Sequence, residues 1–280
     1  MRVAVLGATG ALGRHVVPRL IERGDVVIAV RHRRPAPWLD ALGCESRAAD
    51  ILDARTLTPA IDGCDAVMHL ATAIPPAGAA PDWARNDRVR RDGTFGLIAA
   101  CRAVGVRRYV QQSIAMLCAG HADQWIDEQT PVAPNRVTES AADMERLVRG
   151  SGLDYRIVRG GLFYGGGCGT EDRWRSAARR DELEIPGDGS SYLSLVHVSD
   201  MAQAVVQALH ASTGHLLVNA VDDHPVTYRE LYRYMAAAEG ASPPRDGMPQ
   251  TFASFRVRNT LARQLLDWRP HYASWRAGLA

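Results

Sequence analysis

Residues Arg2–Gly13, with the sequence RVAVLGATGALG, join an apolar run to a glycine-rich turn and then to the start of a helical pattern. Arg2–Leu6 is expected to be a buried strand, because four of its five residues are apolar. Ala11–Arg23 is expected to be a helix, because its apolar residues recur every three or four positions. A strand that passes through a tight turn into a helix is the first part of a βαβ unit, and such units build parallel sheets.

The turn carries three glycines, each with a separate reason to be there. Gly7 lets the chain turn, Gly10 lets the backbone approach a diphosphate, and Gly13 lets the helix pack on the strand. Free N–H groups and the dipole at the start of a helix attract phosphate groups. We therefore predict a dinucleotide site that contains Gly7, Thr9, Gly10, Ala11, Leu12 and Gly13.

The rest of the first half alternates short apolar runs with helical patterns. Further strands are predicted at Val26–Val30, Ser46–Ala49, Ala66–Leu70, Arg108–Gln112 and Tyr155–Val158. Helices are predicted at Thr94–Val104 and Thr138–Gly150, before the last two strands. This alternation indicates an α/β Rossmann fold, a doubly wound parallel sheet covered by helices on both faces.

The pattern changes after Tyr164, where a glycine-rich stretch begins. Strand-like pieces follow, then a helix and a proline-containing surface loop, at Leu193–Val198, Leu216–Asn219, Glu230–Glu239 and Gly240–Gln250. We predict a dinucleotide-binding domain over residues 1–164, completed by later segments, and a smaller, interwoven substrate-binding lobe over residues 165–280.

Composition limits the classes of function. The 280 residues are 46% hydrophobic with a formal net charge of +2, which fits a globular protein and gives no strong field for nucleic acid or membranes. All 33 basic residues are arginine, so no lysine is available as a base, Schiff-base former or proton relay. Five cysteines lie scattered without CxxC spacing, which suits reduced thiols and offers no metal site: Cys44, Cys64, Cys101, Cys118 and Cys168.

The N-terminus leads directly into the first predicted strand, so we expect no signal peptide. No apolar stretch reaches the ~18 residues that a transmembrane helix needs. A cytoplasmic protein acting on a small molecule is the expectation.

The end of the second predicted strand bears on the choice between NAD and NADP. Arg31 stands there, followed by Arg33 and Arg34, where an acidic residue would favour the ribose hydroxyls of NAD. A guanidinium binds a 2′-phosphate well. We predict NADP(H), bound by these three arginines; the alternative is that they form a solvated surface run.

Several motifs together resemble the extended, epimerase/dehydratase-like branch of the short-chain dehydrogenase/reductase superfamily. They are the GxxGxxG spacing, Asp50-Ile51, HLAT at His69–Thr72, Asp92–Val110, RGGLFYGGG at Arg159–Gly167, LVHVSD at Leu195–Asp200, and LLDWRP near the end. The resemblance implies that the dinucleotide also contacts Asp50, Ile51, Leu70, Ala71 and Thr72. It further implies a substrate site beneath the C-terminal lobe, and it is compatible with a homodimer formed by the helices before strands five and six.

The catalytic YxxxK motif of that family is missing. Counting back from Glu145, the matching positions are Val137 and Ala141. The family's serine after strand five corresponds to Ser113, which is expected near the nicotinamide and a substrate oxygen. The departures from the family pattern therefore gather on the nicotinamide side, whereas the adenosine side is intact.

Loops that should enter the substrate cleft supply the remaining candidates. Ser113, Tyr164 and His121 are the predicted catalytic residues, and Tyr164, Trp83 and Trp125 are predicted to contact the substrate. Asp123, Asp127 and Glu128 lie in the same loops, where an ordinary exposed polar role is the alternative for each. His197 and Asp200 are expected to be structural, with Asp200 capping a helix that starts near Met201.

Three hypotheses remain open at this point. The first is an atypical NADPH-dependent reductase of a small carbonyl or alkene. The second is a non-redox cyclase, isomerase or dehydratase that keeps the dinucleotide as a structural or electrostatic part. The third is a binding protein that senses NADP(H).

Overall fold

The computed structural model describes residues 1–31, 36–75, 83–118, 120, 122–248 and 253–279. Its centre is a seven-stranded sheet in which all neighbouring strands are parallel, in the order β12-β7-β5-β4-β1-β2-β3. The strands are β1 (Arg2–Leu6), β2 (Val26–Arg31), β3 (Glu45–Ala48), β4 (Ala66–His69), β5 (Arg108–Ile114), β7 (Asp154–Gly160) and β12 (Leu216–Ala220). The predicted Rossmann fold is confirmed.

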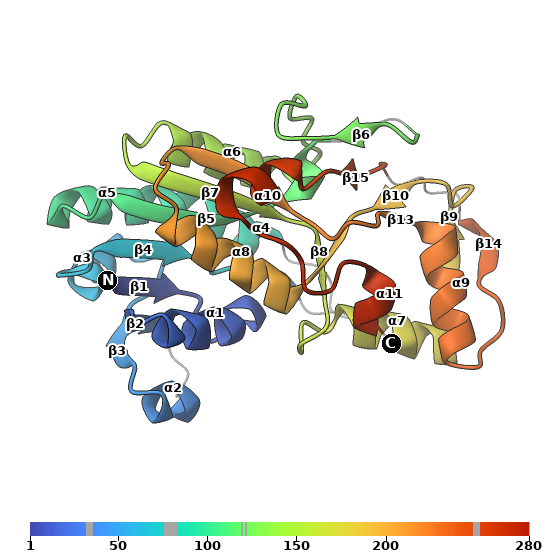
Figure 1. Cartoon of the computed structure of the whole chain (residues 1–280), viewed down its shortest axis with the longest axis horizontal. Coiled ribbons are helices and arrows are strands. Elements are labelled where there is room, and N and C mark those ends of the chain that lie inside the picture. Colours follow the sequence, from blue (N-terminus) through green and yellow to red (C-terminus); the bar gives the residue numbers. More distant parts are fainter. Residues whose placement is uncertain (32–35, 76–82, 119, 121, 249–252, 280) are drawn as a thin grey trace.

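Helices cover both faces of the sheet (Figure 1). One face packs on α1 (Ala11–Glu22), α8 (Val198–His210) and α10 (Thr260–Leu266). The other face packs on α3 (Ala54–Ile61), α5 (Thr94–Val104) and α6 (Glu139–Arg149). Successive strand residues such as Val67 and Met68 enter opposite clusters, because side chains alternate across a strand.

The C-terminal lobe lies beyond the carboxyl ends of the strands (Figure 1). It contains α7 (Thr170–Arg179), α9 (Tyr228–Ala238), α11 (Trp275–Leu279) and four short strands, β9 (Glu184–Pro186), β10 (Tyr192–Leu193), β13 (Val226–Thr227) and β14 (Arg245–Met248). A separate apolar cluster joins them. Between sheet and lobe, β8 (Leu162–Tyr164) pairs with β11 (Leu195–His197). The division at residue 164 stays a prediction.

Leu216–Asn219 is a strand as predicted, and it forms β12 at the edge of the main sheet beside β7. The structure corrects two expectations in the second half. Gly240–Gln250 is not all loop, because β14 pairs there with β9. Asp200 does not cap a helix starting near Met201: α8 begins at Val198, His197 Nδ1 accepts the N–H of Ser199, and Asp200 instead accepts the N–H of Tyr272.

The remaining elements lie near the sheet ends or edges. They are α2 (Pro37–Ala41), α4 (Trp83–Arg88), a π-helical turn η1 (Val89–Gly93), a 3₁₀ turn η2 (Ala115–Leu117), and the paired strands β6 (Trp125–Ile126) and β15 (Arg256–Val257). Across the described ranges, none of the helices is both long and apolar enough to cross a membrane.

Candidate dinucleotide and substrate site

The glycine turn packs backbone against backbone. Gly7 has a φ of +91°, and a Cβ there would lie 2.7 Å from the backbone N of Ala71 and from the carbonyl carbon of Leu70. A Cβ on Gly13 would lie 2.3 Å from the carbonyl oxygen of Gly7. Side chains at these positions would therefore push the turn away from β4 and α1. The turn, the start of α1 and the end of β4 are brought together as predicted for a dinucleotide site.

The space in front of α1 suits a diphosphate. Gly10 is the N-cap of α1, and no side chain caps the helix. A Cβ on Gly10 would meet only the carbonyl oxygen of Gly7, at 3.3 Å, so the space around this position is otherwise open. The N–H groups of Ala11, Leu12 and Gly13 lie in the first helical turn, where helix geometry leaves them without an intrahelical acceptor. Residues present here thus fit the diphosphate of a dinucleotide.

The other predicted cofactor residues lie at the same edge of the sheet. Leu70, Ala71 and Thr72 follow β4, and Asp50 and Ile51 follow β3. Asp50 Oδ1 accepts the N–H of Leu52 at 3.0 Å, which fixes this loop. Thr9 lies in the glycine turn and is partly exposed. Whether each of these residues contacts the cofactor stays a prediction.

Arg31 ends β2, with one of its guanidinium nitrogens 3.9 Å from Asp40 Oδ1. Arg33 and Arg34 lie outside the described residues. Sequence reasoning missed Arg14, an exposed residue of α1 whose guanidinium carbon lies 5.7 Å from the ring centre of Trp38 in α2. Its position directly after Gly13 was the available signal. Arg14 and Arg31 thus both approach α2, where a 2′-phosphate would have cationic partners.

On the nicotinamide side, Ser113 takes part in a buried ionic network. Its hydroxyl donates to Glu145 Oε1 at 2.6 Å, and the same carboxylate accepts Nε and Nη2 of Arg159 at 2.9 and 2.6 Å. All three side chains are buried. The network joins β5, α6 and β7. Ser113 is therefore engaged with Glu145, and its predicted bond to a substrate oxygen stays untested.

The two positions that are predicted to match the family's YxxxK motif carry no proton donor in their side chains. Val137 precedes α6 and is 45% exposed, whereas Ala141 lies within α6 and is fully buried. Ala141 belongs to an apolar cluster with Leu117 and Val221. This cluster takes up the side of α6 on which the family's lysine would stand.

Tyr164 is packed into the lobe. Its side chain is fully buried, and its hydroxyl donates to the carbonyl of Ser274 at 3.4 Å. A Cβ on Gly278 would lie 2.7 Å from this hydroxyl, so α11 sits directly against it. Burial, with nearby carboxylates such as Asp222, raises the pKa of Tyr164 well above its ordinary value. Contact with a substrate would require α11 to move, and the catalytic role predicted for Tyr164 stays untested.

The loop candidates have separate surroundings. Trp125 lies between Arg256 and Arg258, whose guanidinium carbons are 4.3 and 5.1 Å from its ring centre. It lines a hollow of about 290 Å³ with Asp222 and Asp223. Trp83 begins α4 on another part of the chain, and within the described ranges no ring contact joins the two tryptophans. Whether Trp83 and Trp125 both contact a substrate stays a prediction.

The three acidic loop residues hold their own loop in place. The carbonyl of Asp123 accepts Arg256, and the carboxylate of Asp127 accepts two backbone N–H groups of its own turn. Glu128 Oε1 accepts the N–H of Asn219 on β12 at 2.6 Å, and burial raises the pKa of Glu128. His121 lies outside the described residues.

Two buried side chains of the α4 region were missed by sequence reasoning. Asn86 is completely buried and Arg90 is 6% exposed. Both lie on the segment between β4 and β5 that approaches the start of α6. The sequence did not indicate that these two polar residues are buried, because they stand among exposed arginines and aspartates.

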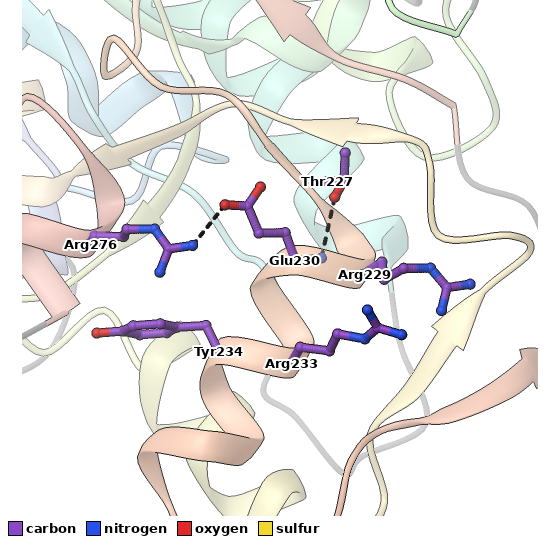
Figure 2. A pocket seen from close by; sticks show the side chains of 6 residues that line it. All are labelled: Thr227, Arg229, Glu230, Arg233, Tyr234 and Arg276. Atoms are coloured by element: carbon purple, nitrogen blue, oxygen red, sulfur yellow. Dashed lines mark hydrogen bonds and ion pairs between the residues drawn. The ribbon is translucent and has the colours of Figure 1, made fainter.

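A second hollow, of about 420 Å³, lies on the lobe between α9 and Arg276 of α11 (Figure 2). Three of its six lining residues are arginines, Arg229, Arg233 and Arg276. Arg276 is paired with Glu230 at 2.8 Å, and Arg229 with Asp246 at 2.8 Å. None of these six residues belongs to the seven-stranded sheet or to the glycine turn, so this hollow is distinct from the dinucleotide site.

Comparison with known proteins agrees with this geometry. A family model described as NAD(P)H-binding matches residues 7–212. The chain is 34% identical to the 3-diazoavenalumate denitrifying reductase of a Streptomyces species, with 100% of this chain and 99% of that protein covered. It is 28% identical to the 2-alkyl-3-oxoalkanoate reductase of Stenotrophomonas maltophilia, over 86% of this chain and 76% of that protein.

Solved structures show the same fold over the whole chain. MoeE5 in complex with UDP-glucuronic acid and NAD matches with a TM-score of 0.83 at 26% identity, covering 100% of this chain and 96% of that one. The UDP-glucose 4-epimerase of Thermotoga maritima has the same coverage and a TM-score of 0.81 at 23% identity. The glycine turn, the parallel sheet and these similarities together show that the chain belongs to the NAD(P)H-binding, epimerase/dehydratase-type extended short-chain dehydrogenases/reductases.

Proposed function

We propose that the protein is an NADPH-dependent reductase that removes the diazo group of a small aromatic compound as N₂. One observation carries the proposal: the sequence has no lysine to complete the family's tyrosine–lysine pair, whose predicted positions are Val137 and Ala141, while the Ser113 hydroxyl is engaged with Glu145. A substrate whose reduction needs no proton from the enzyme fits such a site best.

The candidate substrates differ in whether their reduction needs a proton from the enzyme. Reduction of a carbonyl creates an alkoxide, which an enzyme normally protonates with a positioned acid. Bound NADPH supplies hydride. Addition of hydride to the terminal nitrogen of an aryl diazonium gives a neutral diazene, which requires no proton. The diazene then loses its N–H proton to solvent, the carbon–nitrogen bond breaks with release of N₂, and the carbon takes up one proton from solvent in exchange. The cation and the hydride together equal the arene and N₂, so the reaction balances.

The Streptomyces relative supports this choice, because its name joins a diazo substrate, loss of nitrogen and a reductase. That protein matches over essentially its full length. The oxoalkanoate reductase is less similar and covers less of the chain. Carbonyl reduction is therefore the alternative outcome of the test.

To test the reaction, the purified protein is incubated with NADPH and 3-diazoavenalumate. We expect loss of NADPH absorbance together with an equimolar release of N₂, measured by mass spectrometry on isotopically labelled substrate. Oxidation of NADPH only with 2-alkyl-3-oxoalkanoates would instead identify a carbonyl reductase. Turnover without any change in NADPH would reject reduction.

NADPH is proposed over NADH because Arg31 and Arg14 both approach α2 at the end of β2. Arg31→Asp should weaken NADPH binding at least ~tenfold and leave NADH binding nearly unchanged, because only NADPH carries the 2′-phosphate. Arg107→Asp is the matched control. This exposed arginine precedes β5, so it lies at the amino ends of the parallel strands, whereas Arg31 lies at the carboxyl end of β2. Equal weakening for both dinucleotides, measured by calorimetry, would reject the assignment.

A further inference from the structure

Three residues of the α4 segment share one face. Trp83 and Asn86 are spaced at i and i+3 on α4, which places them one above the other, and Arg90 lies in the π-helical turn that follows. Asn86 and Arg90 are buried and Trp83 is partly buried, whereas Ala84, Arg85 and Arg88 are exposed. This face, which we call the α4 stripe, therefore points into the molecule and carries an indole, an amide and a guanidinium.

Asn86 connects the stripe to the end of β4. Its Oδ1 accepts the N–H of Ala73 at 3.1 Å, directly after the residues Leu70–Thr72 that are predicted to flank the cofactor. Its Nδ2 is buried and has no hydrogen-bond acceptor among the residues that the structure describes. Buried amide donors are usually satisfied, so this amide is available to an acceptor such as a ligand oxygen.

Arg90 connects the stripe to the start of α6. Nη1 donates to Ser140 Oγ at 3.2 Å and approaches the carbonyl of Val137 at 3.5 Å. In the part of the chain that the structure describes, Nε and Nη2 have no acceptor and no carboxylate lies within 4 Å of this guanidinium. The two other most deeply buried arginines, Arg156 and Arg159, are each paired with a carboxylate.

The location of this cation matters for the chemistry. The guanidinium touches Val137, one of the two positions where the family's tyrosine and lysine would stand. Burial lowers the pKa of Arg90, and the Asp87 carboxylate on the same segment opposes this shift without cancelling it. A further anion beside the guanidinium would therefore stabilise its charge. Arginine also stays protonated under all ordinary conditions, so it can hold an anion there and cannot transfer a proton to it.

We propose that the α4 stripe binds a phenolate-type substrate, with Arg90 paired to the charged oxygen next to the reacting carbon, Asn86 Nδ2 donating to the same end of the molecule, and Trp83 stacking on its ring. The proposal rests on the proposed function for its ligand class, an aromatic compound with an anionic oxygen. It does not require hydride transfer, so the two can be tested separately.

The test uses 4-hydroxy-3-nitrocinnamate as a stable coloured probe, added to the full-length protein loaded with NADP⁺. A guanidinium beside the phenol stabilises its anion, so binding should raise the acid ionisation constant of the probe at least ~tenfold, read from the phenolate absorbance across a pH series. The 4-methoxy analogue cannot ionise at this position and should bind at least ~tenfold more weakly.

Variants assign the effect to one residue. Arg90→Gln should abolish the ionisation shift, and Arg90→Lys should keep part of it, because it retains the charge. Arg91→Gln is the matched control, since this neighbouring arginine points to Asp143 and Glu139 on α6. Thermal unfolding and NADPH affinity of each variant show whether the fold and the cofactor site are intact.

The outcomes separate the two proposals. An unchanged ionisation constant on binding to the wild type, or an equal shift in Arg90→Gln, would overturn the α4 stripe as an anion site. If Arg90→Gln weakens NADPH binding and affects the hydroxy and methoxy probes equally, the guanidinium serves the cofactor or the fold, and the proposal also fails. A clear probe shift without consumption of NADPH by diazo substrates would leave the stripe standing and reject the reaction.

Discussion

The carbonyl of Gly7 lies where a side chain on Gly13 would have to be, so a single methyl group decides whether α1 packs on the turn. Gly13→Ala should destabilise the protein by about 1–3 kcal/mol through overpacking and weaken NADPH binding at least ~tenfold. Gly96→Ala is the control: its Cβ would make only ordinary contacts at 3.4 Å or more, and alanine is favoured within a helix. Urea denaturation and calorimetry measure both effects. Unaltered affinity in Gly13→Ala would contradict the packing argument.

His69 is a second residue with a measurable signature. Burial lowers its pKa from 6.5 to about 4, and its Nδ1 lies 3.2 Å from Gln111 Nε2. Below pH 6.5 the unfolded chain takes up a proton that the folded His69 does not. The free energy of unfolding should therefore fall by up to about 3 kcal/mol as the pH decreases from 6.5 to 4. Denaturation of His69→Gln across this range should show a smaller pH dependence; an identical one would assign the effect to other groups.

At the scale of elements, the buried network of Ser113, Glu145 and Arg159 fixes α6 against β5 and β7. Glu145→Gln leaves the guanidinium of Arg159 without its counter-charge, so the free energy of unfolding should fall by about 3–5 kcal/mol. Glu182→Gln removes a solvent-exposed pair with Arg180 and should leave the free energy of unfolding almost unchanged. Urea denaturation of the two variants provides the comparison. Similar losses in both would show that the buried network adds no special stability.

Elements also show how far the sequence could predict the fold. Apolar runs such as Arg2–Leu6 and Ala66–Leu70 predicted central strands correctly, because buried parallel strands are apolar on both faces. Leu216–Asn219 was recognised as strand-like, but its place in the sheet depends on pairing with β7. Strand β14 carries two charged residues and a glycine, so its sequence gave no strand signal.

Some residues of the candidate site could likewise be predicted from the sequence, and others could not. The glycine turn was predictable because its backbone geometry demands glycine at fixed spacing. Arg90 was not, because an arginine in a charged segment looks solvated until the packing of α4 on α6 buries it. Tyr164 shows the opposite case: its motif suggested a site near the cofactor, and α11 covers it.

At the scale of the whole molecule, one large apolar side chain lies exposed on a helix that is expected to form the homodimer. Phe95 on α5 is 66% exposed. We predict that the wild type sediments as a dimer and that Phe95→Arg shifts it to monomer by burying an unpaired charge in the interface. Leu42→Arg, at an exposed site beyond α2, is the control. A monomeric wild type in sedimentation velocity would reject this interface.

The π-helical turn at Val89–Gly93 gives the α4 segment an unusual way to change its inner face during evolution. A π turn holds one residue more than the α-helical turn that it replaces. Loss of a single residue there would restore regular winding and rotate everything before it by about 100°. Trp83 and Asn86 would then leave the inner face while α5 kept its place on the sheet. A single-codon deletion in this turn could therefore change which molecules a relative recognises. The residues that bind the dinucleotide would need no substitution.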